Sequence, residues 1–459
     1  MLVNFKVTNF LSYEQEQILS MEAGKVRAHS ERIYTHQKLK LLKFMAIYGA
    51  NASGKTNLTK AMDFAKRVIV SELPSDCADY YCKLSEENAN LPTKFEFTVE
   101  LDGKRYNYGF SVILKNASFQ SEWLYELTYG KKYNVIFERK VPDNLVIVSS
   151  YFKNEVLNER LGIYADDIKS DDSILFLTLM NKNKAAFYDA FEDAKIYRRL
   201  FGWFRTKLSV NSPDRPITNF SYLMNQESVE KISELLSEFS TGVSQFDLVD
   251  ISIEKVLRDV PKDFVQEIHD HLAEQRKYLS EKKSDEKAAI ILRSSDNAMY
   301  IIELDKNGTT ISKTFQFSHH NTSAVFSLSE ESDGTIRLLD LIEILLSADQ
   351  ERVYVIDEIN RRFHPLLTYH FVEKYLEMAA ERHIQLIVTT HESRIMDFAL
   401  LRKDEINFVN RDDMGRSEIY SLEKYGERFD KKICTAYLRG DYGAIPHFKA
   451  KKLKENNVE

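Results

Sequence analysis

The residues with the clearest chemistry form the segment Gly49-Ala-Asn-Ala-Ser-Gly-Lys-Thr56, a full match to the phosphate-loop pattern GxxxxGK[ST]. An apolar run at residues 44–48 precedes it, and a helix-like stretch at residues 57–70 follows it. A buried strand, a glycine-rich turn and a helix N-terminus together direct backbone N–H groups at phosphate oxygens. We therefore expect Lys55 to reach the β- and γ-phosphates of ATP and Thr56 to bind Mg²⁺.

A second candidate half-site lies far downstream, at residues 352–358, where four β-favouring residues end in Asp357 and Glu358. Parallel strands that are buried on both faces have this pattern, and their C-terminal ends open onto the ligand crevice. We expect Asp357 to hold Mg²⁺ through water and Glu358 to act as the general base on the attacking water. A strand that ends in solvated acids is the alternative interpretation.

Residues 384–391 form another apolar run that ends in His391, and a helix-like stretch at residues 366–382 separates it from the acidic strand. This is the pattern of a β-α-β unit, so His391 is expected beside the Asp357 strand, within reach of the γ-phosphate or the attacking water. A structural histidine is the alternative. Glu358 and His391 suit activation of water better than transfer to an acceptor, which disfavours a phosphoryl-transfer kinase.

Ser332 and Gly334 directly precede a helical run at residues 336–346, which makes a further candidate anion site. A capped helix alone is the alternative. A nucleotide site built on one phosphate loop does not require a second anion site in the same copy. We therefore expect a composite site, in which the Ser332 end of one subunit closes over ATP that is held by Lys55 of another.

Composition is that of an ordinary globular protein of two to three domains: 459 residues, 43% hydrophobic and 29% charged. The net charge of −7 excludes a surface that attracts nucleic acid or anionic membrane as a whole. Three cysteines are too few for a disulfide framework, and neither a secretion signal nor an apolar run of membrane-spanning length occurs. These features predict a cytoplasmic protein with no membrane contact.

The pattern along the chain predicts three parts. Alternating apolar residues from 93 to 139, with an Asp102-Gly103 turn, predict an antiparallel sheet. This sheet and the phosphate loop together form the first part, the N-terminal half of the nucleotide-binding domain, at residues 1–145. Helical patterns then predict a compact helical insertion, 146–288, and strand-like runs lead into a C-terminal half, 289–459. The expected fold class is α/β, with a mixed or parallel core sheet and an antiparallel β lobe.

Together these motifs resemble the ABC-type ATPases of the SMC/RecF/OLD group, and most closely the bacterial RloA-like or AbiL-like abortive-infection ATP-binding proteins. The resemblance covers residues 5–13, the phosphate loop with Asn51 through Asn57, the signature-like 331–337, the Walker B and D-loop segment 357–365, the switch segment 389–392 and the closing motif 440–446. It implies that the following residues bind the nucleotide: Gly49, Asn51, Ser53, Gly54, Lys55, Thr56, Asn57, Ser332 and Gly334. Gln120 is the candidate for the family's metal-binding glutamine, and a surface glutamine is the simpler interpretation.

The resemblance further implies a homodimer or higher even oligomer joined through ATP, acting as the sensor half of an anti-phage system with a separately encoded effector or nuclease. The chain after His391 is too short for the Toprim nuclease of OLD proteins. A RecF-like DNA-binding ATPase is the alternative. Two basic stretches, residues 197–207 and 449–454, are the candidates for contact with nucleic acid, although each is also typical of a solvated helix face.

Overall fold

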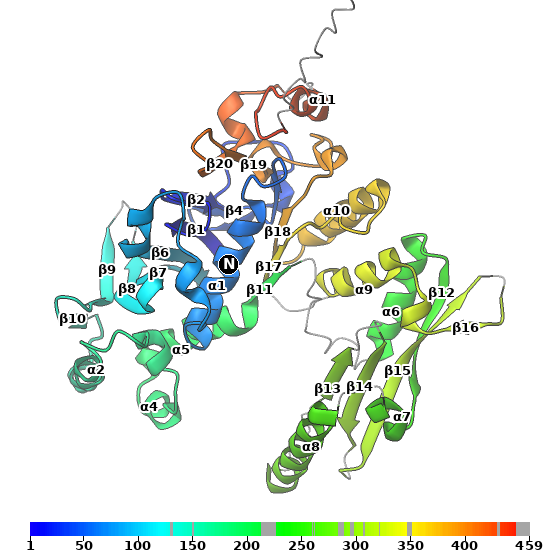
Figure 1. The fold of residues 1–459 in the computed structure, drawn as a ribbon, viewed down its shortest axis with the longest axis horizontal. Coiled ribbons are helices and arrows are strands. Elements are labelled where there is room, and N and C mark those ends of the chain that lie inside the picture. Colours follow the sequence, from blue (N-terminus) through cyan, green and yellow to red (C-terminus); the bar gives the residue numbers. More distant parts are fainter. Residues whose placement is uncertain are drawn as a thin grey trace, which may run out of the picture. The chain divides into compact units, whose positions relative to one another are not determined.

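The computed structural model describes residues 1–128, 132–148, 151–212, 226–258, 260, 262–282, 289–293, 298–305, 308–320, 322–346, 351–428 and 432–446. Contacts within the chain group it into two compact units (Figure 1). Unit 1 comprises Met1–Arg215, Asp349–Arg361 and Phe371–Glu459, and unit 2 comprises Pro216–Ala348 and Arg362–His370. In the described part of the chain, no helix is both long and apolar enough to span a membrane.

The core of unit 1 is a six-stranded sheet that is parallel except at one edge. In spatial order its strands are β11 (Leu208–Asn211), β17 (Val353–Ile356), β18 (Gln385–Thr389), β5 (Phe44–Tyr48), β19 (Ile406–Arg411) and β20 (Ser417–Ser421). The first five run parallel, and β20 returns antiparallel to β19. Every residue of β5, β17 and β18 is buried, as expected of strands covered on both faces.

A seven-stranded sheet, antiparallel in every pairing, makes the second layer of unit 1. Its strands, in spatial order, are β10 (Leu145–Val148), β9 (Tyr133–Lys140), β8 (Ser118–Leu127), β7 (Lys104–Ile113), β6 (Thr93–Leu101), β1 (Leu2–Thr8) and β2 (Gln17–Ser20). Two short strands, β3 (Tyr34–His36) and β4 (Leu39–Leu41), form a separate hairpin. The alternation at residues 93–139 therefore predicted this sheet correctly.

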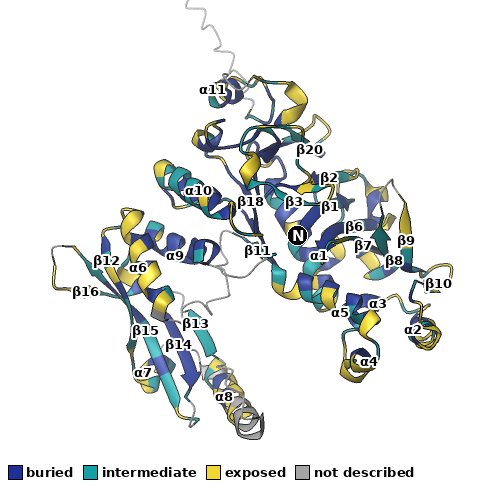
Figure 2. Cartoon of the chain, turned by 180° about the vertical axis from the view of Figure 1, so that it is seen from behind, coloured by how far each residue is buried: buried dark blue, intermediate teal, exposed yellow. Residues whose placement is uncertain are grey.

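Helix α1 (Lys55–Val70) follows the phosphate loop and supplies much of the core of unit 1. Its buried face carries Leu58, Met62 and Phe64, while residues such as Lys60 remain exposed. Figure 2 colours the chain by burial, from dark blue for buried to yellow for exposed residues. Phe64 packs against Phe10 and Phe95, which joins the helix to the antiparallel sheet. Each large apolar side chain buried in this way contributes about 1.5–3 kcal/mol, so the helix that presents Lys55 is fixed firmly.

The remaining α-helices of unit 1 come after the antiparallel sheet and between or after the core strands in the sequence. They are α2 (Glu155–Asp167), α3 (Phe176–Leu179), α4 (Ala185–Ala190), α5 (Lys195–Gly202) with a π-helical turn (Trp203–Lys207), α11 (Ile433–Leu438), and the part of α10 (Pro365–Ala379) that belongs to unit 1. Tyr375 of α10 packs on Phe44 and donates a hydrogen bond to the Lys43 carbonyl, 2.8 Å, so α10 is attached at the start of β5.

Unit 2 has its own sheet and its own apolar core. The strands are β12 (Val243–Asp250), β15 (Thr310–His319), β14 (Met299–Leu304) and β13 (Ala289–Arg293), with β16 (Val325–Phe326) paired to β15. The helices are α6 (Gln226–Glu238), α7 (Ile253–Arg258), α8 (Lys262–Lys282) and α9 (Asp333–Leu346). Apolar side chains of α7, α8 and β14 pack together in this core: Val256, Ile268, Leu272, Tyr300, Ile302 and Leu304.

The bounds of the two units differ from the bounds of the three parts that were expected from the sequence. Residues 146–212 pack with unit 1, because β11 pairs with β17 of the core sheet and Trp203 and Phe204 enter the core. Residues 226–282 share unit 2 with β13, β14 and β15, which the sequence assigned to the C-terminal half. The segment 146–288, for which a compact helical insertion was expected, also contains the strands β11 and β12.

Candidate nucleotide-binding site

The strand order of the core sheet brings the predicted functional residues to one edge. Strand β18 lies between β17 and β5, and all three run in the same direction. Asp357 comes directly after β17 and Gly49 directly after β5, and a single residue separates His391 from the end of β18. Because C-terminal ends of parallel strands lie at the same edge, segments hundreds of residues apart converge at the crevice where α/β sheets bind ligands.

The phosphate loop has the geometry that its glycines require. Gly54 has φ +115°, a left-handed conformation that favours glycine, and α1 begins at the next residue, Lys55. A Cβ at Gly54 would lie 2.3 Å from the Ser417 Oγ, and a Cβ at Gly49 would lie 2.4 Å from the Val409 carbonyl oxygen. Both positions therefore exclude larger residues, and the loop is packed against the β19–β20 hairpin.

Lys55 is buried within its own loop. Only 5% of the residue is exposed, and its ammonium donates hydrogen bonds to the carbonyls of Gly49, 2.8 Å, and Ala50, 3.0 Å. Burial lowers the pKa of Lys55 to about 8, against the opposing negative charges of Asp357 and Glu358. Lys55 therefore lies near enough to Asp357 and Glu358 for their charges to act on its ammonium.

A turn from the N-terminal strand supports the loop from outside. The Tyr13 hydroxyl donates to the Gly54 carbonyl, 2.9 Å, and the Asn57 amide donates to the Ser12 Oγ, 2.8 Å. From the other side, the Ser417 hydroxyl donates to the Ser53 carbonyl, 2.6 Å. Burial, and then the charge of Asp357, raise the pKa of Tyr13, so its hydroxyl stays protonated as a donor.

Thr389, the last residue of β18, connects the two acidic residues. Its hydroxyl donates to the Asp357 Oδ1, 2.5 Å, and accepts from the backbone N–H of Glu358, 2.8 Å. The residue is fully buried, as is Asp357 at 1% exposure. One hydroxyl thus fixes the orientation of the carboxylate and the path of the chain at Glu358. Sequence reasoning missed Thr389, although the Thr-Thr-His ending of this strand was visible.

Glu358 has an unusual backbone. Its φ is +50°, in the left-handed region that residues other than glycine seldom occupy. Such a conformation costs on the order of 1–3 kcal/mol and persists only where surrounding contacts impose it. Here those contacts are the bond from the Glu358 N–H to Thr389 and the bond from the Ile359 N–H to the Thr389 carbonyl, 3.1 Å. The strain turns the chain sharply at the residue expected to be the base.

His391 lies at the same edge and is held through Asn360. The Asn360 Oδ1 accepts from the backbone N–H of His391, 3.2 Å, and from the Thr390 hydroxyl, 3.0 Å. Partial desolvation and the nearby charge of Lys55 lower the pKa of His391, while Asp357 opposes the shift. The imidazole is therefore biased toward its neutral form and lies within the field of Lys55 and Asp357.

Comparison with known families agrees with this geometry. A family model described as "AAA domain, putative AbiEii toxin, Type IV TA system" matches residues 44–397, a span that includes Lys55, Asp357 and His391. The chain belongs to this family. It is therefore an AAA-type nucleotide-binding protein by descent. No curated protein matches the chain significantly.

Solved structures that resemble this AAA protein include SMC head domains. A structure of the SmcHead bound to the C-winged helix domain of ScpA has 16% identity and a TM-score of 0.43, covering 93% of this chain and 99% of that chain. The Smc head with an extended coiled coil bound to the C-terminal domain of ScpA, from Pyrococcus furiosus, has 14% identity, a TM-score of 0.37 and coverages of 93% and 97%. The SMC head domain from Thermotoga maritima has 13% identity and a TM-score of 0.34, covering 92% of this chain and 98% of that chain.

The side chains of this AAA protein fit ATP with Mg²⁺. The Asp357 Oδ2 is buried and has no hydrogen-bond partner among the described residues, which leaves an oxygen for a metal-bound water. The Lys55 ammonium is bonded to two carbonyls of the loop that would cradle phosphates. Thr56 stands next to it at the start of α1. These residues would hold the triphosphate and the metal, and bound Mg²⁺ would neutralise phosphate charge.

Three other predicted site residues lie elsewhere in the fold. Gln120 is in β8 of the antiparallel sheet, and its amide donates to the Ser118 carbonyl, 3.1 Å, and Oγ, 3.0 Å. Ser332 and Gly334 belong to unit 2, at the start of α9, where the Ser332 Oγ accepts from the Thr335 N–H, 3.1 Å.

The basic segment considered for contact with nucleic acid has structural partners. In the basic segment 197–207, Tyr197, Trp203 and Phe204 are buried in the core, and Arg199 pairs with Asp102, 2.8 Å. His319 lies 2.7 Å from Glu331, and no cluster of metal ligands occurs among the residues described. The basic tail at 449–454 lies outside the described residues.

The lowered pKa of Lys55 predicts that nucleotide binding takes up a proton. Near pH 8.5 much of the lysine is neutral in the free protein, and bound phosphate would favour its charged form. We expect uptake of a large fraction of one proton per nucleotide at pH 8.5 and almost none at pH 7, where Lys55 is already charged. Calorimetric titration in two buffers of different ionisation enthalpy measures this. Equal heats in both buffers at pH 8.5 would contradict the assigned pKa.

Removal of the Thr389 hydroxyl should weaken the metal site without unfolding the strand. Thr389→Val keeps the β-branched shape, while Asp357 and the Glu358 N–H each lose a partner. Groups that orient metal-binding residues typically contribute about 10- to 100-fold in metal affinity or activity, and we expect a loss of that size. Titration of Mg²⁺ into the ATP complex measures it, and Thr389→Ser, which restores the hydroxyl, should recover most of the loss. Similar defects in both variants would assign Thr389 a packing role only.

Proposed function

We propose that this protein is an ATP-hydrolysing switch of a bacterial anti-phage, abortive-infection system, which regulates a separately encoded toxic effector or nuclease. The observation that carries the ATPase part is the convergence of Lys55, Asp357 and Glu358 at one sheet edge, where the charges of both carboxylates act on the Lys55 ammonium. The family description, with its putative toxin of a toxin–antitoxin system, supports the defence part.

In this proposal each residue has a separate role in the hydrolysis of the phosphate bond. Lys55 and the loop N–H groups bind the β- and γ-phosphates, and Thr56 with Asp357 holds Mg²⁺. Glu358 orients the attacking water and accepts its proton, while the carboxylate of Asp357 remains fixed by Thr389. His391 would contact the γ-phosphate or that water from the neighbouring strand.

The proposal also includes a pair of copies, each closing the site of the other. Ser332 supports this role because it is exposed and stands at the N-terminal end of α9, which is 14 residues long. The preceding Glu331 is paired with His319, so the segment is fixed in place. An exposed hydroxyl at a helix N-terminus suits the phosphates of a nucleotide bound to a second copy.

A mixing experiment tests the shared site. Lys55→Ala and Ser332→Arg should each abolish ATP hydrolysis alone, after circular dichroism has verified that both fold. In a mixed pair, one site carries both defects and the other carries none, so the mixture should regain activity, approaching one quarter of wild type at equal amounts and random pairing. No recovery on mixing would place both residues in the site of a single copy.

A second experiment tests the regulatory output. The protein expressed with its neighbouring genes should co-purify with a second protein, and ATP should change the amount retained. Glu358→Gln, which we expect to hold ATP, should trap the ATP-dependent state of that complex. A chain that protects cells from phage with no bound neighbour would contradict the effector part while leaving the ATPase part intact.

A further inference from the structure

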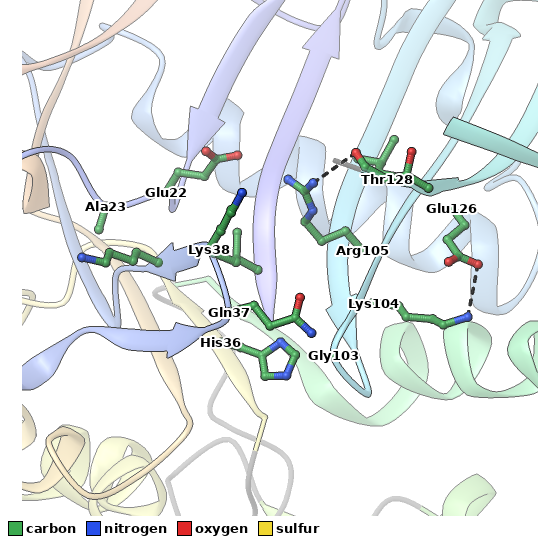
Figure 3. A pocket seen from close by; sticks show the side chains of 13 residues that line it. Glu22, Ala23, His36, Gln37, Lys38, Gly103, Lys104, Arg105, Glu126 and Thr128 are labelled. Atoms are coloured by element: carbon green, nitrogen blue, oxygen red, sulfur yellow. Dashed lines mark hydrogen bonds and ion pairs between the residues drawn. The ribbon is translucent and has the colours of Figure 1, made fainter. Parts of the chain in front are cut away.

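Unit 1 contains a pocket of about 440 Å³ whose lining includes none of the residues of the nucleotide site (Figure 3). Its walls come from residues 22–23 after β2, residues 36–40 of the β3–β4 hairpin, residues 103–105 at the start of β7 and residues 126–128 at the end of β8. The volume lies within the range of about 300–1,000 Å³ that is usual for small-molecule sites. These four segments all belong to unit 1.

Hydrogen bonds and close packing hold the walls in place. The Arg105 guanidinium donates to the Thr128 carbonyl, 3.4 Å, and the Lys104 ammonium lies 3.4 Å from the Glu126 carboxylate, as Figure 3 shows. The His36 ring rests on Gly103, where a Cβ would lie 2.7 Å from its Cε1. Gly103 has φ +79°, and its N–H donates to the Glu100 carboxylate, 2.7 Å. The two hairpins are therefore fitted to each other.

The pocket is positively charged although the protein is acidic. Four cationic side chains, of Lys38, Lys40, Lys104 and Arg105, face two carboxylates, of Glu22 and Glu126. Glu126 is already paired with Lys104 and also accepts a hydrogen bond from the Tyr151 hydroxyl. The chain as a whole carries −7. A concave surface lined by one sign of charge concentrates the field and attracts ions of the opposite sign.

The lining also limits what kind of anion would bind. The apolar side chains in the lining are those of Ala23, Leu39 and Leu127, and the aromatic ring in the lining is the imidazole of His36. Lysine and arginine side chains suit phosphate oxygens, whereas a nucleobase would require a stacking face or an apolar slot. The lining therefore favours closely spaced phosphate groups over an aromatic or apolar ligand.

We propose that this pocket, formed by the β3–β4 and β6–β7 hairpins, is a second anion site that binds a ligand with several adjacent phosphates. Such phosphates have two sources, a free oligophosphate or the backbone of a nucleic acid. The site is distinct from the phosphate loop in every residue. Strand β4 is joined to β5, the strand that enters the phosphate loop, by Leu42 and Lys43 alone, so both sites share one short stretch of chain.

The test uses the full chain carrying Lys55→Ala, so that the phosphate loop contributes as little binding as possible and the outcome does not depend on the proposed ATPase function. The probes are inorganic tripolyphosphate, followed by calorimetry, and a fluorescent 20-nucleotide single strand, followed by anisotropy. Lys40→Glu is added to reverse a charge in the pocket. Lys115→Glu is the matched control, because Lys115 is also exposed and lies just beyond the opposite end of β7, in the turn Leu114–Asn116.

We expect at least one probe to bind, and Lys40→Glu to weaken that binding about tenfold while Lys115→Glu leaves it within twofold. Raising salt from about 50 to 200 mM should weaken it as well, because phosphate contacts release counterions. Binding of tripolyphosphate identifies a free oligophosphate as sufficient, and binding of the oligonucleotide alone identifies a nucleic-acid backbone. Binding of neither probe, or equal weakening by Lys40→Glu and Lys115→Glu in variants with unchanged melting curves, would overturn the proposal.

Discussion

Lys55→Ala should reduce the affinity for ATP by about 100-fold or more, because a buried ammonium that meets phosphate charge contributes several kcal/mol in a site of low dielectric. In the free protein Lys55 is bonded to the carbonyls of Gly49 and Ala50, 2.8 and 3.0 Å away. Alanine removes both bonds and the charge but leaves α1, which favours alanine, intact. Equilibrium titration with a fluorescent ATP analogue measures the loss.

Lys60→Ala is the control for this substitution. Lys60 lies on the same helix, is exposed and is five residues further along, so its removal tests a change of net charge without a change in the loop. We expect its affinity for ATP to stay within twofold of wild type. If Lys55→Ala and Lys60→Ala bind ATP equally well, the phosphate loop is not the nucleotide site and the proposed function fails.

Glu358→Gln should slow ATP hydrolysis by about 10²- to 10⁴-fold, the usual contribution of a general base, while ATP binding is retained. Glutamine has the size of glutamate and keeps the backbone N–H that Thr389 accepts, so the strained turn is preserved. Because hydrolysis would release the pair of copies, the variant should accumulate a paired, ATP-bound form. Phosphate release and light scattering after gel filtration measure the two effects.

Glu381→Gln provides the comparison, since it makes the same chemical change at an exposed position after α10. Its turnover should match wild type. Undiminished turnover of Glu358→Gln would remove the general-base assignment, and slow turnover with no paired form would separate hydrolysis from the proposed pairing. The two substitutions at Lys55 and Glu358 thus distinguish loss of binding from loss of chemistry.

The sequence by itself determined the local features that carry chemistry. The phosphate loop is a short-range pattern, and its glycines, strand and helix are all encoded within residues 44–70. The apolar runs before Asp357 and His391 were recognisable because strands buried on both faces are nearly continuous runs of apolar residues. The alternation at residues 93–139 likewise predicted an antiparallel sheet, because side chains in strands point alternately to opposite faces.

The tertiary structure alone decided which distant residues touch. Strand β11 has only four residues and follows a helical segment, so no periodic signal indicates that it extends the core sheet beside β17. The bond from Thr389 to Asp357 and that from Tyr13 to Gly54 join residues with no pattern in common. Such contacts depend on strand order, which a linear sequence does not express, because hydrophobic periodicity specifies the face of an element and not its neighbour.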